Sequence, residues 1–133
     1  MNPKTAIKMM LYLLVAVILF HLSIILKIVP YEITWGGRLT NDSEMYVFES
    51  ISIIINLFLF SILLIKGKYL REFISMKIVN ITLWIFFVLF GLNTIGNILA
   101  ITNLEKFFTL LTLASSILIW IILRKDKKRT HNN

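Results

Sequence analysis

Four apolar runs, each long enough to cross a lipid bilayer as a helix, constrain this chain more than any other feature. They cover roughly residues 9–29, 46–65, 78–100 and 105–123. A helix of about 20 residues rises about 30 Å, the thickness of the hydrocarbon layer. A soluble chain of 133 residues that is 58% hydrophobic has too little interior to hide so many apolar side chains. The sequence predicts an all-α four-helix transmembrane bundle, one domain over residues 1–123, with a basic tail at 124–133.

Local signals mark the ends of the predicted helices. Pro30 ends the first run because it cannot continue the backbone hydrogen bonds, and Gly67 is a typical residue just beyond a helix C-terminus. Asn41, with Glu44 three positions later, is a variant of the capping box that begins helices. Residues 102–105 form a second capping box, so we expect a very tight turn between the last two helices.

The first run has an alternative interpretation as a cleaved signal peptide. Lys4 and Lys8 precede the run, and a basic start followed by an apolar core is common to both kinds of segment. The run is long for a signal peptide, and no small-x-small cleavage site follows it. We therefore expect a retained helix.

The distribution of basic residues predicts the orientation in the membrane, because Lys and Arg favour the cytoplasmic side. With four spans, eleven of the fourteen fall on one side and only Lys27, Arg38 and Lys106 on the other. We expect both termini on the cytoplasmic side of the membrane. The polar segment between the first two helices is then a longer extracytoplasmic loop.

This orientation concentrates polar side chains in the outer half of the bundle. Packed apolar layers leave little room, whereas polar residues among small ones need partners or water. We expect the main cavity there, lined by Glu49 and Asn93 or Asn97 and covered by Trp35. The candidate ligand-binding residues are Trp35, Arg38, Glu49, Asn56, Asn93 and Asn97. The alternative is that the Asn, Ser and Thr side chains only join helices, as they often do in membranes.

Glu49 differs from these uncharged side chains, because an acid about one turn inside the bilayer is costly unless it is paired or hydrated. Arg38 and Lys27 are its expected ionic partners, and an Arg38–Glu49 clamp would pin the loop over the bundle. The competing interpretation is a functional carboxylate, with His21 as the second candidate catalytic residue.

The sequence lacks the motifs that several kinds of chemistry require. There is no cysteine, which excludes disulfides and zinc–thiolate sites. No phosphate-binding loop, hydrolase motif or metal-ligand cluster is present, so we expect no cofactor and no metal. The basic residues sit at the ends of apolar runs and form no aromatic-interleaved stripe, so nucleic acid is not an expected partner.

Three segments carry a resemblance to a known family: Trp35-Gly-Gly-Arg38, Glu44-Met-Tyr-x-Phe-Glu49 and Asn93-Thr-Ile-Gly-Asn97. Together they resemble a family of small, uncharacterised four-helix bacterial integral membrane proteins, which implies the fold but no activity. The architecture alone is also similar to the sterol-isomerase and sigma-2 receptor superfamily. That similarity is an analogy of fold and assigns no site residue.

Two functional hypotheses follow. The first is a binding protein that takes a small amphiphile, a lipid or a partner helix in a polar pocket of the outer half. The second is a small membrane enzyme that uses Glu49 for proton transfer on a lipid-like substrate. A subunit of an oligomeric transporter is a weaker third, since four helices would have to dimerise for alternating access. The lipid bilayer is the expected environment, and a second copy or another membrane protein is a possible partner.

Overall fold

The fold of this chain was obtained as a computed structural model, which describes residues 1–34, 38–99 and 103–131, with side chains to residue 124. It is all-α in this described part. Each of its four long helices is long and apolar enough to cross a membrane.

The elements follow the order expected from the four apolar runs. They are α1 (Pro3–Ile25), a short 3₁₀ turn η1 (Tyr31–Ile33), α2 (Asp42–Lys66), α3 (Met76–Ile98) and α4 (Asn103–His131).

Helix α1 begins and ends earlier than the expected range 9–29. The Asn2 side chain accepts a hydrogen bond from the Lys4 amide, and Pro3 occupies the first turn, where its missing N–H costs nothing. At the other end, Lys27 takes a left-handed backbone conformation with φ of 61°. This conformation ends α1 before Pro30 is reached.

Helix α2 confirms the predicted cap at Asn41, whose side chain accepts a hydrogen bond from the Glu44 amide at 2.8 Å. Its C-terminus differs from the expectation for Gly67. Gly67 keeps a right-handed conformation, and Lys68 is the left-handed residue, with φ of 64°. A side chain at Gly67 would lie 2.8 Å from the Tyr69 ring, so close approach explains the glycine better than backbone freedom does.

The last two helices also begin slightly earlier than expected. The Ser75 side chain caps α3. Helix α4 begins at Asn103, so the expected capping residue Thr102 lies outside the described residues. At its C-terminus α4 continues through the basic run to His131 instead of stopping at Leu123.

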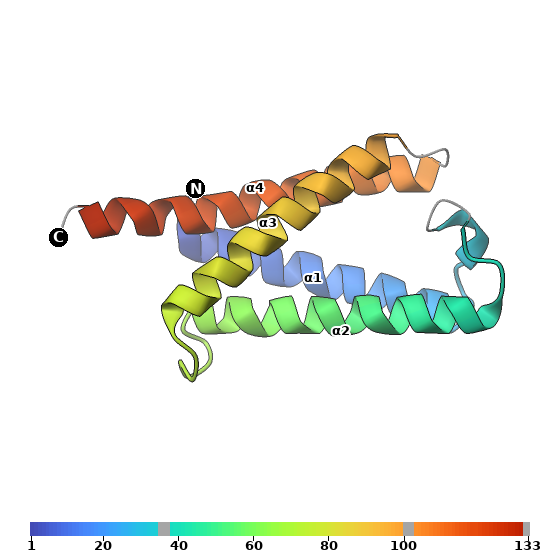
Figure 1. Cartoon of the computed structure of the whole chain (residues 1–133), viewed down its shortest axis with the longest axis horizontal. Helices are drawn as coiled ribbons and strands as arrows, with labels where there is room; N and C mark the ends of the chain where they lie inside the picture. Colours follow the sequence, from blue (N-terminus) through green and yellow to red (C-terminus); the bar gives the residue numbers. More distant parts are fainter. Residues whose placement is uncertain (35–37, 100–102, 132–133) are drawn as a thin grey trace.

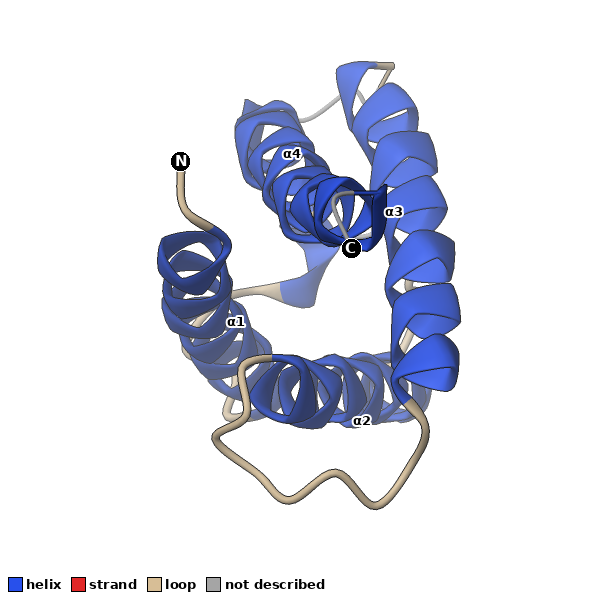
Figure 2. Ribbon diagram, turned by 90° about the vertical axis from the view of Figure 1, so that its left-hand side faces the viewer, coloured by secondary structure: helices blue, strands red, loops and turns tan. Residues whose placement is uncertain are grey.

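The four helices form a ring in which each packs on its chain neighbours and α1 also packs on α4 (Figures 1 and 2). Contact between α3 and α4 is the most extensive, and contact between α2 and α3 is the least. Figure 1 shows α3 diverging from α2 toward the end where α1 joins α2. That end also holds the α3–α4 connection, and the two chain termini lie at the opposite end.

The apolar core occupies the half of the bundle nearer the termini, which we call the core half. Every helix contributes buried side chains to it, from Ala6–Leu14, Leu59–Ile65, Val79–Phe86 and Leu118–Leu123. A smaller cluster of Ile24, Leu39 and Met45 lies at the other end. We call this other half, which contains His21, Glu49, Thr94 and Thr112, the polar half.

Candidate functional site

A buried hydrogen bond joins α1 to α2 in the polar half. His21 Nδ1 and Glu49 Oε2 lie 2.5 Å apart, within hydrogen-bond distance. Glu49 is completely buried, and the side chain of His21 is only 16% exposed. The two candidate catalytic residues of the sequence analysis are therefore brought together, on neighbouring helices and shielded from the surroundings.

The expected ionic partners of Glu49 lie elsewhere. Arg38 is exposed, and Lys27 Nζ pairs with Asp42 at 2.6 Å. The early end of α1 explains the second pairing, because it places Lys27 in the loop opposite the first residue of α2. The expectation that Arg38 or Lys27 neutralises Glu49 is thus replaced by a bond to His21, the second candidate catalytic residue of the sequence analysis.

A second polar contact joins α3 to α4. The hydroxyls of Thr94 and Thr112 lie 2.9 Å apart, and Ser116 donates a hydrogen bond to the Phe87 carbonyl at 3.3 Å. Thr109 lies one turn before Thr112 on α4, and its buried hydroxyl has no hydrogen-bond partner among the described residues. This stripe agrees with the interpretation that these side chains hold helices together.

Aromatic contacts connect the two helix pairs. The rings of Phe20 on α1 and Phe108 on α4 meet edge to face at 5.0 Å between centroids. On the other side of the ring of helices, Phe58 of α2 lies 6.3 Å from Phe86 of α3. The face of α3 that carries Phe86 is therefore the face toward α2.

The asparagines of α3 belong to this same face. Asn93 and Asn97 follow Phe86 by about two and three helical turns, so their side chains project on the side of α3 from which α2 has diverged. Asn93 is exposed and Asn97 is half-buried. Neither amide makes a hydrogen bond to any described residue.

Asn56 has a more local role. Its side-chain amide donates to the Ser52 carbonyl, one turn earlier on α2, at 2.7 Å. It remains half-buried. Trp35, which was expected to cover the cavity, lies outside the described residues.

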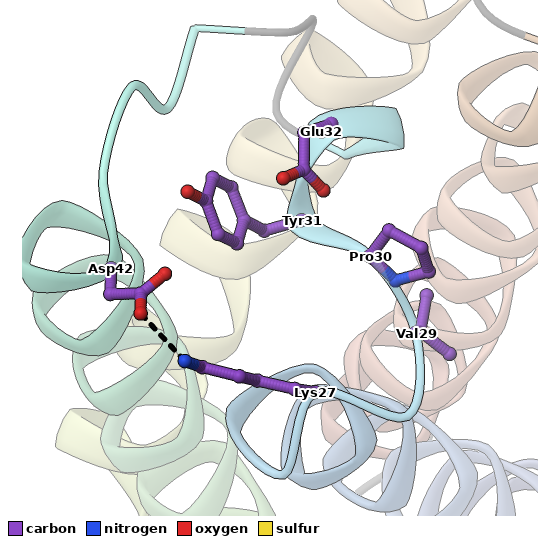
Figure 3. A pocket seen from close by; sticks show the side chains of 6 residues that line it. All are labelled: Lys27, Val29, Pro30, Tyr31, Glu32 and Asp42. Carbon is purple, nitrogen blue, oxygen red and sulfur yellow. Dashed lines mark hydrogen bonds and ion pairs between the residues drawn. The ribbon is translucent and has the colours of Figure 1, made fainter.

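A half-open pocket lies between the end of α1 and the start of α2. It has a volume of about 250 Å³ and is lined by Lys27, Val29, Pro30, Tyr31, Glu32 and Asp42 (Figure 3). The sequence analysis missed this pocket, because it counted Lys27 as an expected partner of Glu49. The turn of the chain between α1 and α2 was the available signal, because it brings charged residues of both signs close together.

A second, shallow hollow of about 390 Å³ lies on the outer surface of α3. Its lining of Ile81, Trp84, Ile85, Val88 and Leu89 is almost wholly apolar. Such a surface is typical of a helix face in contact with lipid chains. No group of three metal-ligating side chains occurs among the residues that the structure describes.

These features define a multi-pass, membrane-type helical protein with hydrogen bonds between its helices and a pocket at one end. The chain matches no protein-family model, no curated protein and no solved structure. Its function is therefore argued from its own residues.

Proposed function

We propose that this chain is a small, non-catalytic membrane protein that binds a partner transmembrane helix on the face of α3 that carries Asn93. The observation that carries the proposal is Asn93, an exposed amide within the apolar span Met76–Ile98. It lies six residues from the middle of this span, which corresponds to roughly 9 Å of helix rise. The hydrocarbon layer extends about 15 Å from its centre, so Asn93 would face lipid chains.

An amide in lipid is poorly satisfied, because acyl chains neither donate nor accept hydrogen bonds. Asn97, one turn further along, adds a second amide to the same face. Helix α2, from which α3 diverges, offers exposed apolar side chains, among them Ile51 and Ile55. A helix that carries its own polar residue fits these surfaces, since it can bond the amides and pack on aliphatic side chains.

The proposal assigns Glu49 a structural role. Its carboxylate already bonds His21, and its side chain is fully buried, so a substrate would have to break an existing contact to reach it. Proton transfer by Glu49 is therefore the less supported alternative. A small amphiphile at the same face of α3 is the other ligand to be tested.

A photoreactive amino acid in place of Asn93 tests the proposal in cell membranes. We expect cross-links to a protein of discrete mass, which is a second copy if the mass doubles. The matched control places the same group at Ile85, which is exposed on another face of α3 and should yield lipid adducts. Lipid adducts alone at both positions would contradict a partner helix. A small-molecule adduct confined to position 93 would support the amphiphile instead.

The proposal includes an orientation with both termini in the cytoplasm of a bacterium and the α1–α2 loop outside. The asymmetry of eleven basic residues against three supports it. Because the chain has no cysteine, single cysteines at positions 40 and 130 can be labelled in intact cells without background. We expect an impermeant reagent to label position 40 only. Labelling of both positions from one side would contradict the orientation.

A further inference from the structure

The pocket at the end of α1 combines charges of both signs with an aromatic ring. Lys27 and Asp42 meet along one side, and Tyr31 and Glu32 approach from the η1 turn (Figure 3). Two carboxylates against one ammonium leave one net negative charge in the pocket. Asp42 is paired with Lys27 at 2.6 Å, so the carboxylate left for a ligand is that of Glu32.

These groups suit a cation better than an anion. A carboxylate beside an aromatic face is a common arrangement for binding ammonium groups. Desolvation, together with the negative charges of Asp42 and Glu32, raises the pKa of Tyr31, which keeps its phenol neutral at physiological pH. The hydrogen bond to Asp42 raises the pKa of Lys27, so Lys27 remains a cation that can meet an anionic group next to the ligand's ammonium.

The position of the pocket limits the source of such a ligand. Lys27 follows the last residue of α1 by two positions, and Asp42 is the first residue of α2, so the pocket lies where two apolar spans end. Headgroups of lipids occupy this depth of a membrane. Leu26 and Ile28 flank the pocket and are about 70% exposed, which provides an apolar surface for acyl chains beside it.

The volume agrees with a headgroup and not with a whole lipid. Sites for drug-sized ligands measure roughly 300–1,000 Å³. The pocket of about 250 Å³ is slightly smaller and is open on one side. A headgroup can therefore enter while its chains remain in the bilayer.

We propose that this pocket binds the amine-bearing headgroup of a zwitterionic phospholipid. The ammonium group contacts the Glu32 carboxylate and the Tyr31 ring, and the phosphate contacts Lys27. Lys27 carries three N–H donors, so it can bond Asp42 and the phosphate together. The site is separate from the Asn93 face of α3 and does not depend on a partner helix.

Native mass spectrometry of the protein in detergent with added lipid tests this inference. We expect phosphatidylethanolamine to bind more tightly than phosphatidylglycerol, whose headgroup lacks the amine. Glu32→Gln should weaken phosphatidylethanolamine binding about fivefold, the effect of one partly solvated ionic contact. It should leave phosphatidylglycerol unchanged. Glu32 is exposed, so the variant should keep the wild-type circular dichroism spectrum.

Lys68→Gln is the matched control for Lys27→Gln. Both lysines occupy the left-handed position after a helix, with φ of 64° and 61°, but Lys68 does not line the pocket. Only Lys27→Gln should reduce lipid binding. Equal binding of the two lipids, or unchanged binding by Glu32→Gln, would overturn the proposal. Displacement of the lipid by equimolar soluble phosphoethanolamine would keep the ammonium site but overturn its assignment to a lipid.

Discussion

The core half and the polar half of this bundle hold their helices together in different ways. In the core half, side chains from all four helices are buried against one another, among them Leu14, Leu63, Leu83 and Ile119. In the polar half, hydrogen bonds join the helices in pairs, α1 with α2 and α3 with α4. The comparison shows one apolar core shared by all four helices in one half, and polar contacts within two helix pairs in the other.

The physical reason is that lipid removes the hydrophobic driving force between helices. Acyl chains are as apolar as leucine, so helices associate through close packing and through hydrogen bonds that lipid cannot replace. Close packing needs several helices around one point, and the divergence of α3 from α2 removes that condition in the polar half (Figure 1). There, the hydrogen bonds of His21 with Glu49 and of Thr94 with Thr112 join the helices in two pairs.

The largest effect is expected in the core half. Leu83→Ala removes a fully buried side chain from α3 and should lower the free energy of unfolding by about 2 kcal/mol, because the cavity loses packing contacts. Unfolding by SDS in mixed micelles, followed by circular dichroism, measures it. The control Ile85→Ala alters an exposed side chain of the same helix and should change little. Equal losses from both variants would show that the core half is not tightly packed.

A smaller effect is expected for the polar contact between α3 and α4. Thr94→Val keeps the shape of the side chain but removes the hydroxyl that meets Thr112, which should cost about 1 kcal/mol in the same assay. Thr82→Val is the control, because the Thr82 hydroxyl bonds the Ile78 carbonyl of its own helix. If Thr82→Val costs as much as Thr94→Val, the interhelical bond contributes nothing specific.

The smallest effect is expected at the end of α2. Gly67→Ala places a methyl group against the Tyr69 ring, which is about half exposed and can move aside. The gain in helix propensity offsets part of the cost of this contact, so the free energy of unfolding should fall by less than about 1 kcal/mol. A loss as large as that of Leu83→Ala would mean that the α2–α3 connection is fixed more rigidly than the exposed ring suggests.

The sequence predicted the helices better than their partners. Apolar runs of sufficient length identified all four spans, and the Asn41 cap identified the start of α2. The start of α1 was missed because Lys4 and Lys8 made its first two turns look like a polar leader. Backbone capping by Asn2 depends on local geometry and not on hydropathy.

The site was less predictable for a related reason. His21 and Glu49 were both recognised as unusual, yet they are 28 positions apart, and their meeting depends on how α1 rotates against α2. Charge alone favoured Arg38 as the partner of Glu49. The early end of α1 and the pairing of Lys27 with Asp42 could not be read from the apolar pattern.

The most direct test of this account is the coupling between His21 and Glu49. A double-mutant cycle of His21→Ala and Glu49→Ala should give an interaction free energy of about 1–2 kcal/mol, since each replacement removes the same buried bond. A parallel cycle of Glu49→Ala with Tyr12→Ala, an exposed residue of α1, should be additive within about 0.5 kcal/mol. Additivity in the His21–Glu49 cycle as well would contradict the claim that this contact holds α1 and α2 together in the polar half.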